Sequence, residues 1–342
     1  MTIKEIAKKL DVSPSTVSMV LNNRPGISAE TRNKVLRLVE ETGYSIYGSK
    51  NRRIKNKGNI QLVIFKKHSK VVSDTPFFSL LIEGLEARAR EYGYQLAITY
   101  ATADTFSVDV INNLLNNNNI NGVIFLATEM EERDIDKILK LKMPVVALDS
   151  YFMGKEIDSI IINNTEGSYI AAKHLIENGH KKIGYLSSSI RINNFEERKR
   201  GYMLALNNYY IEYNEDYNIK LEPTMEGAYL DMIRYLKHNT KLSTAFFADN
   251  DIIALGAIRA LKEYNFKIPD DISIVGFDDM PFCTILDPPL TTIIVDKKIM
   301  GQITIDRLIQ KIEKKSNSIL KTELSVKIVK RNSVKNLISA LE

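Results

Sequence analysis

The sequence predicts an N-terminal all-α helix-turn-helix head followed by an α/β core of two doubly wound parallel-sheet lobes. Three observations indicate this organisation. Residues 1–44 combine helical apolar spacing with helix-capping residues, residues 45–58 are polar and basic, and from Ile60 onward short apolar strands alternate with amphipathic helices. The length of 342 residues suits two or three domains. We therefore expect a head at 1–44, a basic linker at 45–58 and a core at 59–342.

Composition excludes several classes of protein. Apolar residues make up 44% of the chain and charged residues 26%, which excludes overall disorder. No uncharged apolar run reaches the roughly 18 residues that a bilayer span needs, and the N-terminus lacks the continuous apolar segment of a secretory signal. We expect a cytoplasmic protein with no membrane partner. The single cysteine, Cys283, excludes a disulfide framework and any CxxC pair, and we expect it to be buried.

The positive charge of the chain is confined to its first sixth. Residues 1–58 carry 12 Lys and Arg against 5 Asp and Glu, a net charge of +7. Residues 59–342 carry 35 against 37, a net charge of −2. A basic head on a near-neutral body indicates a polyanionic partner for the head alone.

Capping signals divide the head into three helices. Thr2 and Glu5 form a capping box at the start of the first helix, and Ser13 and Ser28 are N-cap residues for the second and third. Helical spacing turns mostly small, uncharged side chains outward on the second helix: Ser15, Thr16, Ser18, Met19 and Asn22. Two helices joined by a tight turn and braced by a third, together with the charge, predict a DNA reader whose second helix enters the major groove. A three-helix bundle that docks on another protein has the same spacing and is the alternative.

The core reads as two series of strands. The first series has strands at 60–65, 94–100, 122–127 and 144–149 with a helix at 77–92, and the second has strands at 159–163, 182–188, 244–251 and 272–279. Continuous apolar strands with helical crossovers predict two parallel sheets, and such sheets bind ligands at the carboxyl ends of their strands. We expect lobe one at about 59–160 and 293–322, lobe two at about 161–292 and 323–342, and a ligand site between them.

Two segments of the head, TIKEIAKKLDVSPSTVSMVLNN (2–23) and GISAETRNKVLRLVEETGY (26–44), resemble the DNA-binding domain of the lactose-repressor (LacI/GalR) family. The resemblance implies that Pro14, Ser15 and Met19 read bases. It also implies phosphate contacts from a further set: Thr2, Ser18, Asn22, Ser28, Thr31 and Tyr44. The family usually has arginine at the position of Met19. A thioether offers only apolar contact, so we expect a half-site without the guanine preference that arginine gives.

The linker, SIYGSKNRRIKNKG (45–58), departs from the family pattern. Family members carry Pro-Asn-x-x-Ala-x-x-Leu here and form a hinge helix on DNA that inserts leucine into the minor groove. Arg53 falls at the leucine position, and Ile54 is the candidate apolar side chain after a one-residue shift. Arg52 and Arg53 belong to a basic run that can neutralise phosphates, so we expect DNA affinity to fall steeply with salt.

Further segments, VVALDS (145–150), ERKRGYMLAL (197–206), AFFADNDIIALGAIRAL (245–261) and IPDDISIVGFDD (268–279), resemble in order the periplasmic-binding-protein-like core of the same family. The resemblance implies that an effector binds in the cleft between the two lobes. It assigns seven residues to that site: Phe77, Phe78, Asp149, Asn163, Arg198, Asn250 and Asp278.

The chemistry of these residues suits a sugar or a related polyol. Asp149 and Asp278 end apolar strands, where a carboxylate can accept two hydrogen bonds from a vicinal diol; helix N-capping is the alternative for both. Arg198 offers a planar fork of donors. Phe77 and Phe78 can stack on a sugar ring, and we expect one of them to belong to the core instead. Two carboxylates and one guanidinium favour a neutral ligand over a phosphorylated one.

Motifs of catalysis are absent from the sequence. It contains no GxxxxGK[ST], GxGxxG, HExxH or GxSxG motif, and its four histidines have no metal or triad spacing. We expect no catalytic residue, no metal and no cofactor. Asp278 and Asp279 are adjacent in a strand and point to opposite faces, so they make a poor catalytic pair, and we expect Asp279 to cap a helix. His180 is expected at the surface.

The leading hypothesis is a ligand-controlled transcriptional repressor. A head of this size covers only half a site, so a homodimer would bind a pseudo-palindromic double-stranded operator, with a small neutral ligand (a sugar, polyol or nucleoside) controlling its affinity. Two alternatives for the control remain open: a partner protein, or a purine-type co-repressor in place of a sugar inducer. A sugar-binding protein or hydrolase without a DNA role is the remote alternative.

Overall fold

The computed structural model describes residues 3–21, 24–41, 56–72, 76–109, 111, 119–238, 241–316 and 318–338. The chain divides into two compact units, Met1–Lys55 and Asn56–Glu342. No helix among the described residues is long and apolar enough to cross a membrane.

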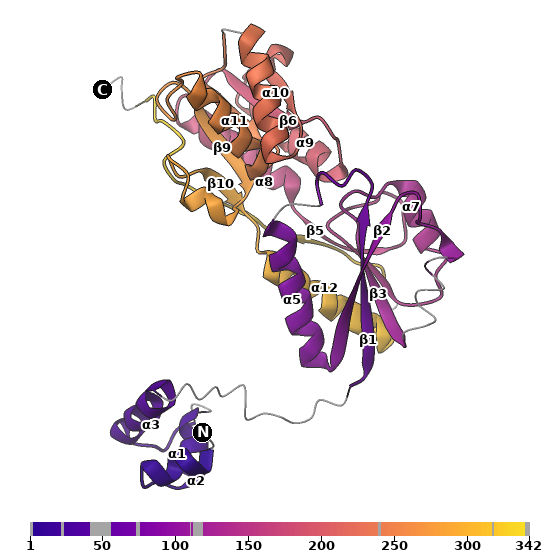
Figure 1. The fold of residues 1–342 in the computed structure, drawn as a ribbon, viewed down its shortest axis with the longest axis vertical. Helices are drawn as coiled ribbons and strands as arrows, with labels where there is room; N and C mark the ends of the chain where they lie inside the picture. The colour runs from indigo at the N-terminus through magenta and orange to yellow at the C-terminus, as the bar shows by residue number, and fades with distance from the viewer. Residues whose placement is uncertain are drawn as a thin grey trace. The chain divides into compact units, whose positions relative to one another are not determined.

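Within its described residues, the first unit consists of α1 (Ile3–Lys9), α2 (Pro14–Leu21) and α3 (Ala29–Glu41) (Figure 1). The apolar side chains that helical spacing turns inward form one small core: Ile6, Ala7, Val17, Val20 and Val35. Ser13 caps α2, because its hydroxyl oxygen accepts a hydrogen bond from the Thr16 amide at 3.0 Å. Ser28 caps α3 in the same way, accepting from the Thr31 amide at 3.2 Å. The two predicted caps and the helix-turn-helix arrangement are confirmed.

Lobe one of the second unit is built on a six-stranded parallel sheet with the strand order β11-β5-β4-β3-β1-β2. Its strands are β1 (Gly58–Lys66), β2 (Tyr94–Thr102), β3 (Ile120–Leu126), β4 (Val145–Leu148), β5 (Asp158–Ile162) and β11 (Lys321–Leu324). Its described helices include α5 (Pro76–Tyr92), α7 (Glu132–Ile138) and α12 (Lys297–Ile312).

Helices α5 and α12 lie side by side against the first sheet (Figure 1). Their close approach depends on glycine. A Cβ atom at Gly301 of α12 would lie 2.5 Å from the carbonyl oxygen of Leu81 in α5, and one at Gly84 would lie 2.3 Å from the carbonyl oxygen of Lys298. The two helices therefore pack backbone to backbone.

Lobe two has a second six-stranded sheet with the order β12-β10-β9-β8-β6-β7, parallel except for β12. Its strands are β6 (Ile183–Ser188), β7 (Asn218–Leu221), β8 (Ala245–Ala248), β9 (Ser273–Asp278), β10 (Thr291–Ile294) and β12 (Lys327–Val329). Its helices are α8 (Asn164–Glu177), α9 (Asn193–Asn208), α10 (Met225–His238) and α11 (Asp251–Glu263), with short 3₁₀ turns η1 (Glu215–Tyr217) and η2 (Pro281–Thr284). The predicted architecture of two doubly wound lobes is confirmed.

Strand β5 belongs to lobe one, although the sequence predicts it in lobe two. The apolar run at 159–163 was predicted to open the second sheet, but β5 pairs with β4 and β11 in the first sheet. The buried carboxylate of Asp158 fixes it there, because it pairs with Arg307 and Lys311 of α12. The chain accordingly crosses between the lobes after β5, after β10 and after β11.

Two single-residue expectations have different outcomes. Cys283 is buried, as predicted. The expectation that His180 lies at the surface is wrong, because the side chain is buried and its Nδ1 lies 3.1 Å from the Thr244 hydroxyl oxygen. A segment near Leu337 lies next to this turn, because the Leu337 amide donates a hydrogen bond to the Asn178 carbonyl at 2.9 Å.

Candidate functional site

Helix α2 carries the residues predicted to read bases. Pro14 and Ser15 are exposed at its first turn, and Met19 is half-buried. The Ser15 hydroxyl lies 2.6 Å from that of Ser13, the residue that caps the helix. The exposed start of α2 thus consists of a short hydroxyl cluster, followed one turn later by a thioether.

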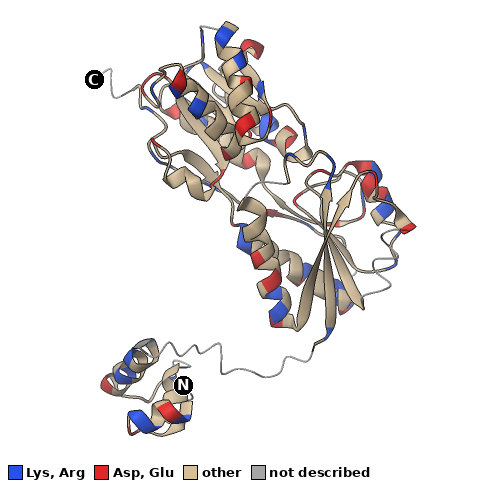
Figure 2. Cartoon of the chain, in the orientation of Figure 1, with Lys and Arg blue, Asp and Glu red and all other residues tan. Residues whose placement is uncertain are grey.

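Predicted phosphate-contacting residues lie at the second and third helices. Ser28 and Thr31 place their hydroxyl oxygens 2.8 Å apart at the start of α3, and Ser18 is half-buried on α2. Lys and Arg positions occur on the helices of this unit (Figure 2). The exposed ones among the described residues are Lys4, Lys8, Lys9, Arg24, Lys34 and Arg37. The remaining predicted DNA contacts lie outside the described residues: Thr2, Asn22, Tyr44, Arg52, Arg53 and Ile54.

In the second unit, six of the seven predicted effector residues surround one small cavity between the lobes. They are Phe77, Phe78, Asp149, Arg198, Asn250 and Asp278. The cavity has a volume of about 30 Å³ and is completed by five other side chains: Val71, Thr128, Ile192, Asn194 and Phe195. Both lobes contribute, since α5 and the end of β4 belong to lobe one while α9 and the end of β9 belong to lobe two.

Arg198 is the buried cation of this cavity. Its Nε donates to the Asn164 side-chain oxygen at 2.9 Å, and its Nη2 donates to Asp278 at 3.1 Å. Its Nη1 donates to the Asp249 carbonyl, and the guanidinium lies over the Phe277 ring, 3.7 Å from the centroid. Each of the three guanidinium nitrogens therefore donates one hydrogen bond within the protein itself.

Asp149 is the buried carboxylate from lobe one. It follows β4 with a left-handed backbone (φ 65°) and accepts hydrogen bonds from the Thr128 hydroxyl at 2.7 Å and the Asn194 amide at 3.1 Å. Burial raises its pKa to about 6, although the hydrogen bond from Thr128 and the charge of Arg198 oppose the rise. Its side chain therefore bonds neighbouring side chains rather than capping a helix.

Asp278, the carboxylate from lobe two, has a raised pKa because burial outweighs the charges of Arg198 and Lys297. Lys297 is buried beside it at the start of α12 and donates to the Asp278 backbone carbonyl. The ammonium also lies 5.5 Å from the centroid of the Phe77 ring. The two carboxylates that line the cavity, Asp149 and Asp278, are therefore matched by two cations: Arg198, which also lines it, and Lys297, which lies beside Asp278.

Phe77 and Phe78 occupy equivalent positions at the start of α5. Both are buried in the apolar core, and both border the cavity, with ring centroids 5.2 Å apart in an edge-to-face arrangement. The expected division into one core ring and one cavity ring is not seen, because the first turn of α5 presents both rings to the same space.

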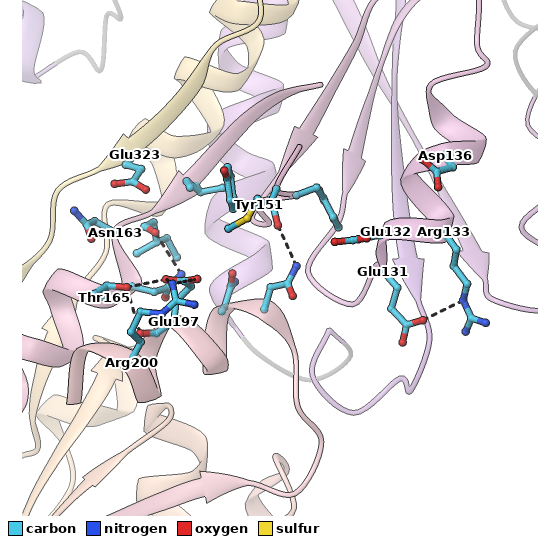
Figure 3. Close-up of a pocket in the computed structure, with 17 residues that line it drawn as sticks. Glu131, Glu132, Arg133, Asp136, Tyr151, Asn163, Thr165, Glu197, Arg200 and Glu323 are labelled. Carbon is cyan, nitrogen blue, oxygen red and sulfur yellow. Dashed lines mark hydrogen bonds and ion pairs between the residues drawn. The ribbon is translucent and has the colours of Figure 1, made fainter. Parts of the chain in front are cut away.

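Asn163 lies apart from the other six residues. Its side-chain oxygen accepts from the Glu166 amide at 3.0 Å and caps α8. It borders a separate, open groove of about 930 Å³ between the lobes (Figure 3). Asn194 borders both the groove and the small cavity. Asn250 also caps a helix, accepting from the Ile253 amide at 2.9 Å, but it does reach the small cavity.

The groove is acidic. Its walls carry five carboxylates against two guanidinium groups: Glu131, Glu132, Asp136, Glu197 and Glu323, with Arg133 and Arg200. Figure 3 shows that these side chains come from both sides, with Glu197 and Arg200 on α9 and Glu132 on α7. A negatively charged ligand would meet repulsion there.

The helix-cap prediction for Asp279 is wrong. Its carboxylate accepts from Arg331 at 2.6 Å, and no side chain caps the 3₁₀ turn η2 that follows it. The sequence analysis did not assign Thr128 and Asn194 to the cavity, although the position of each in the sequence indicates it. Thr128 lies just beyond the carboxyl end of β3, and Asn194 precedes Arg198 by one helical turn on the same face.

Two family models match the chain. The model "Bacterial regulatory proteins, lacI family" matches residues 2–45, and a "Periplasmic binding protein-like domain" matches residues 172–334. The HTH-type transcriptional repressor PurR of Mannheimia succiniciproducens is 31% identical over 98% of this chain and 99% of its own length. The ribose operon repressor of Haemophilus influenzae is 29% identical over the same shares. The solved lac repressor dimer bound to operator and the anti-inducer ONPF is 25% identical, with a TM-score of 0.70 over 98% of this chain and 99% of that one.

Proposed function

This chain belongs to the lacI family of bacterial regulatory proteins, and we propose that it is a transcriptional repressor whose operator affinity is set by a small neutral ligand bound between its lobes. One observation carries the proposal: polar and aromatic side chains from both lobes converge on a single cavity. Such convergence is typical of a site that recognises a polar organic molecule.

The size of the cavity bears on how the ligand enters. About 30 Å³ is an order of magnitude below the roughly 300 Å³ of small organic-ligand sites. A ligand therefore binds when the lobes separate, and it replaces the contacts that Arg198 and Asp149 now make within the protein. Because the ligand favours one lobe arrangement over another, its binding is coupled to the shape of the core.

Charge and shape favour a sugar, polyol or nucleoside. The carboxylates of Asp149 and Asp278 are balanced by Arg198 and Lys297, which leaves no excess positive charge for a phosphate group. Carboxylates and a guanidinium together offer acceptors and donors for vicinal hydroxyl groups. The paired rings of Phe77 and Phe78 also suit a flat base, so a purine-type co-repressor is the second candidate.

For DNA, we assign base reading to α2 through Pro14, Ser15 and Met19. Phosphate contacts fall to a second set: Thr2, Ser18, Asn22, Ser28, Thr31 and Tyr44. Arg52, Arg53 and Ile54 are assigned to the minor groove. The exposed hydroxyls at the start of α2 and the basic side chains around it support this assignment. A cytoplasmic regulator of this kind needs no catalytic residue and no cofactor.

We further propose a homodimer on a pseudo-palindromic operator. One three-helix head reads only a half-site, so two heads are required for a full site. Lobe two also exposes large apolar side chains: Ile285 is 83% exposed, Met225 47% and Leu230 45%. These suit burial against a second copy, and the lac repressor relative is itself described as a dimer bound to operator.

The test begins with selection of bound sequences from random DNA, using the full chain. The recovered duplex is then titrated by fluorescence anisotropy with and without neutral pentoses, hexoses, disaccharides, nucleosides, purines and their phosphates. Thermal melting of the protein with the same compounds detects binding independently of DNA. A ligand at 100 times its Kd raises the free energy of unfolding by about 2.7 kcal/mol. Selection of no palindrome, or a bound ligand that leaves DNA affinity unchanged, would count against the proposal.

A further inference from the structure

Glu129, a buried glutamate between β3 and α7, holds together the loop that follows β1. Only 3% of its surface is exposed. Its carboxylate accepts hydrogen bonds from backbone amides and from no described side chain. One oxygen accepts from Lys67 (2.6 Å), His68 (2.8 Å) and Ser69 (3.4 Å), and the other accepts from Val71 (3.2 Å) and Val72 (3.1 Å).

This loop depends on the carboxylate for its shape. Its amides converge on one point, which makes a cradle for an anion. Ser69 has a left-handed backbone (φ 55°), a conformation that costs a non-glycine residue energy and needs support from its surroundings. Without an acceptor, the buried amides of Val71 and Val72 would be left unpaired, so the loop would rearrange.

The same loop makes direct contacts with lobe two. Val71 is 7% exposed and packs against Ile192 and Phe195 at the start of α9. The Lys70 ammonium lies 2.5 Å from the Glu222 carboxylate, just before α10. Val71 also borders the small cavity, so the loop joins the cavity wall to the lobe contact.

We propose that Glu129 is a positioning residue for lobe closure: by holding the loop at 67–72, it places Val71 and Lys70 against lobe two. Glu129 itself does not reach the cavity. An effect of Glu129 on ligand affinity rests on the proposed function, because closure of the lobes would enclose a ligand bound in the cavity. The lobe arrangement can be measured without ligand or DNA, so the two proposals fail independently.

The first test compares Glu129→Gln with Glu132→Gln. Both variants remove one negative charge from neighbouring positions, but Glu132 is exposed and its side chain has no hydrogen bond or ion pair among the described residues. Amide hydrogen exchange of peptides covering 67–72 is measured by mass spectrometry. Glu129→Gln should exchange at least tenfold faster in this segment, and Glu132→Gln should match the parent protein. Unchanged exchange in Glu129→Gln would overturn the anchoring role.

The second test measures the lobe separation directly. Cysteines replace Lys140 in lobe one and Lys237 in lobe two, both exposed, for spin labels; the natural Cys283 is buried. Dipolar spectroscopy should give a longer and broader distance distribution in Glu129→Gln than in the parent or in Glu132→Gln. Faster exchange at 67–72 with an unchanged distance would overturn the proposal, because the loop would then not control closure.

A further variant keeps the proposal testable if Glu129→Gln does not fold. Val71→Ala leaves the carboxylate and its amide partners in place but removes part of the contact with Ile192 and Phe195. It should lengthen the distance between the labels while exchange at 67–69 stays as in the parent. An unchanged distance in Val71→Ala would show that this loop does not hold the lobes together.

Discussion

Replacing Asp149 with asparagine should change how stability depends on pH. The folded protein holds this carboxyl at a pKa of about 6, against 3.8 when it is exposed, because the closed cavity removes it from water. Between these values the folded state binds a proton that the unfolded state has released. The free energy of unfolding of the parent protein should therefore fall as pH rises through this window, and stay lower above it. Asparagine does not titrate, so the variant loses this contribution.

The magnitude follows from the two pKa values. At pH 5 a carboxyl with a pKa of about 6 is largely protonated, while one with the exposed value of 3.8 is largely ionised. Linkage then gives the parent protein on the order of 1 kcal/mol more stability at pH 5 than at pH 7.5 from this group alone. Titrating groups whose pKa does not depend on Asp149, such as Asp251 with a pKa of about 7, act equally in both proteins and cancel in the difference.

The assay is urea unfolding of the parent and Asp149→Asn at pH 5.0 and 7.5, followed by tyrosine fluorescence, since the chain has 16 tyrosines and no tryptophan. Asp104→Asn, at an exposed carboxylate, is the control and should give the same difference from the parent at both pH values. A parent-minus-variant difference that is the same at the two pH values would refute the reasoning. It would mean that water reaches Asp149 and that the lobes are open in solution.

Three further substitutions test other parts of the structure. Arg198→Ala leaves Asp278 buried without its partner and should lower the free energy of unfolding by about 3–5 kcal/mol in urea, whereas a loss below about 1 kcal/mol would contradict the buried pair. Met19→Arg should introduce a guanine preference into half-sites selected from random DNA, and an unchanged half-site would argue against α2 as the reading helix. Gly301→Ala should destabilise the core by about 1–3 kcal/mol in thermal melts, because its Cβ cannot fit beside Leu81 unless the helices part; equal stability would contradict that contact.

Local sequence patterns predicted the elements well because each depends on near neighbours. Caps such as Ser13 and Ser28 bond amides three residues away, and apolar periodicity identifies one face of a helix. The rule that parallel sheets bind ligands at their carboxyl edges placed the ligand site between the lobes, and the family resemblance assigned Asp149 and Asp278 to it. Both residues border the same cavity, at the ends of β4 and β9.

What the sequence did not predict depends on partners far along the chain. Apolar character marks β5 as a strand but not which sheet it joins, since pairing is decided by Asp158 and α12 about 150 residues later. His180 and Asp279 received local interpretations. The segment near 331–337 instead bonds Asn178, two residues before His180, and the carboxylate of Asp279. The closed state of the cavity is likewise a property of packing between lobes and has no local signal.

Both sheets receive an edge strand from one short stretch, 321–329, which supplies β11 to lobe one and β12 to lobe two. During synthesis, β5 and β10 therefore keep an unpaired edge until the ribosome has passed this stretch. Neither lobe consists of one continuous segment, so neither can complete its fold before residues 321–329 are synthesised. A nascent chain stalled before Lys321 would expose backbone hydrogen-bonding groups on two sheets at once, and each open edge is a template for pairing with another chain.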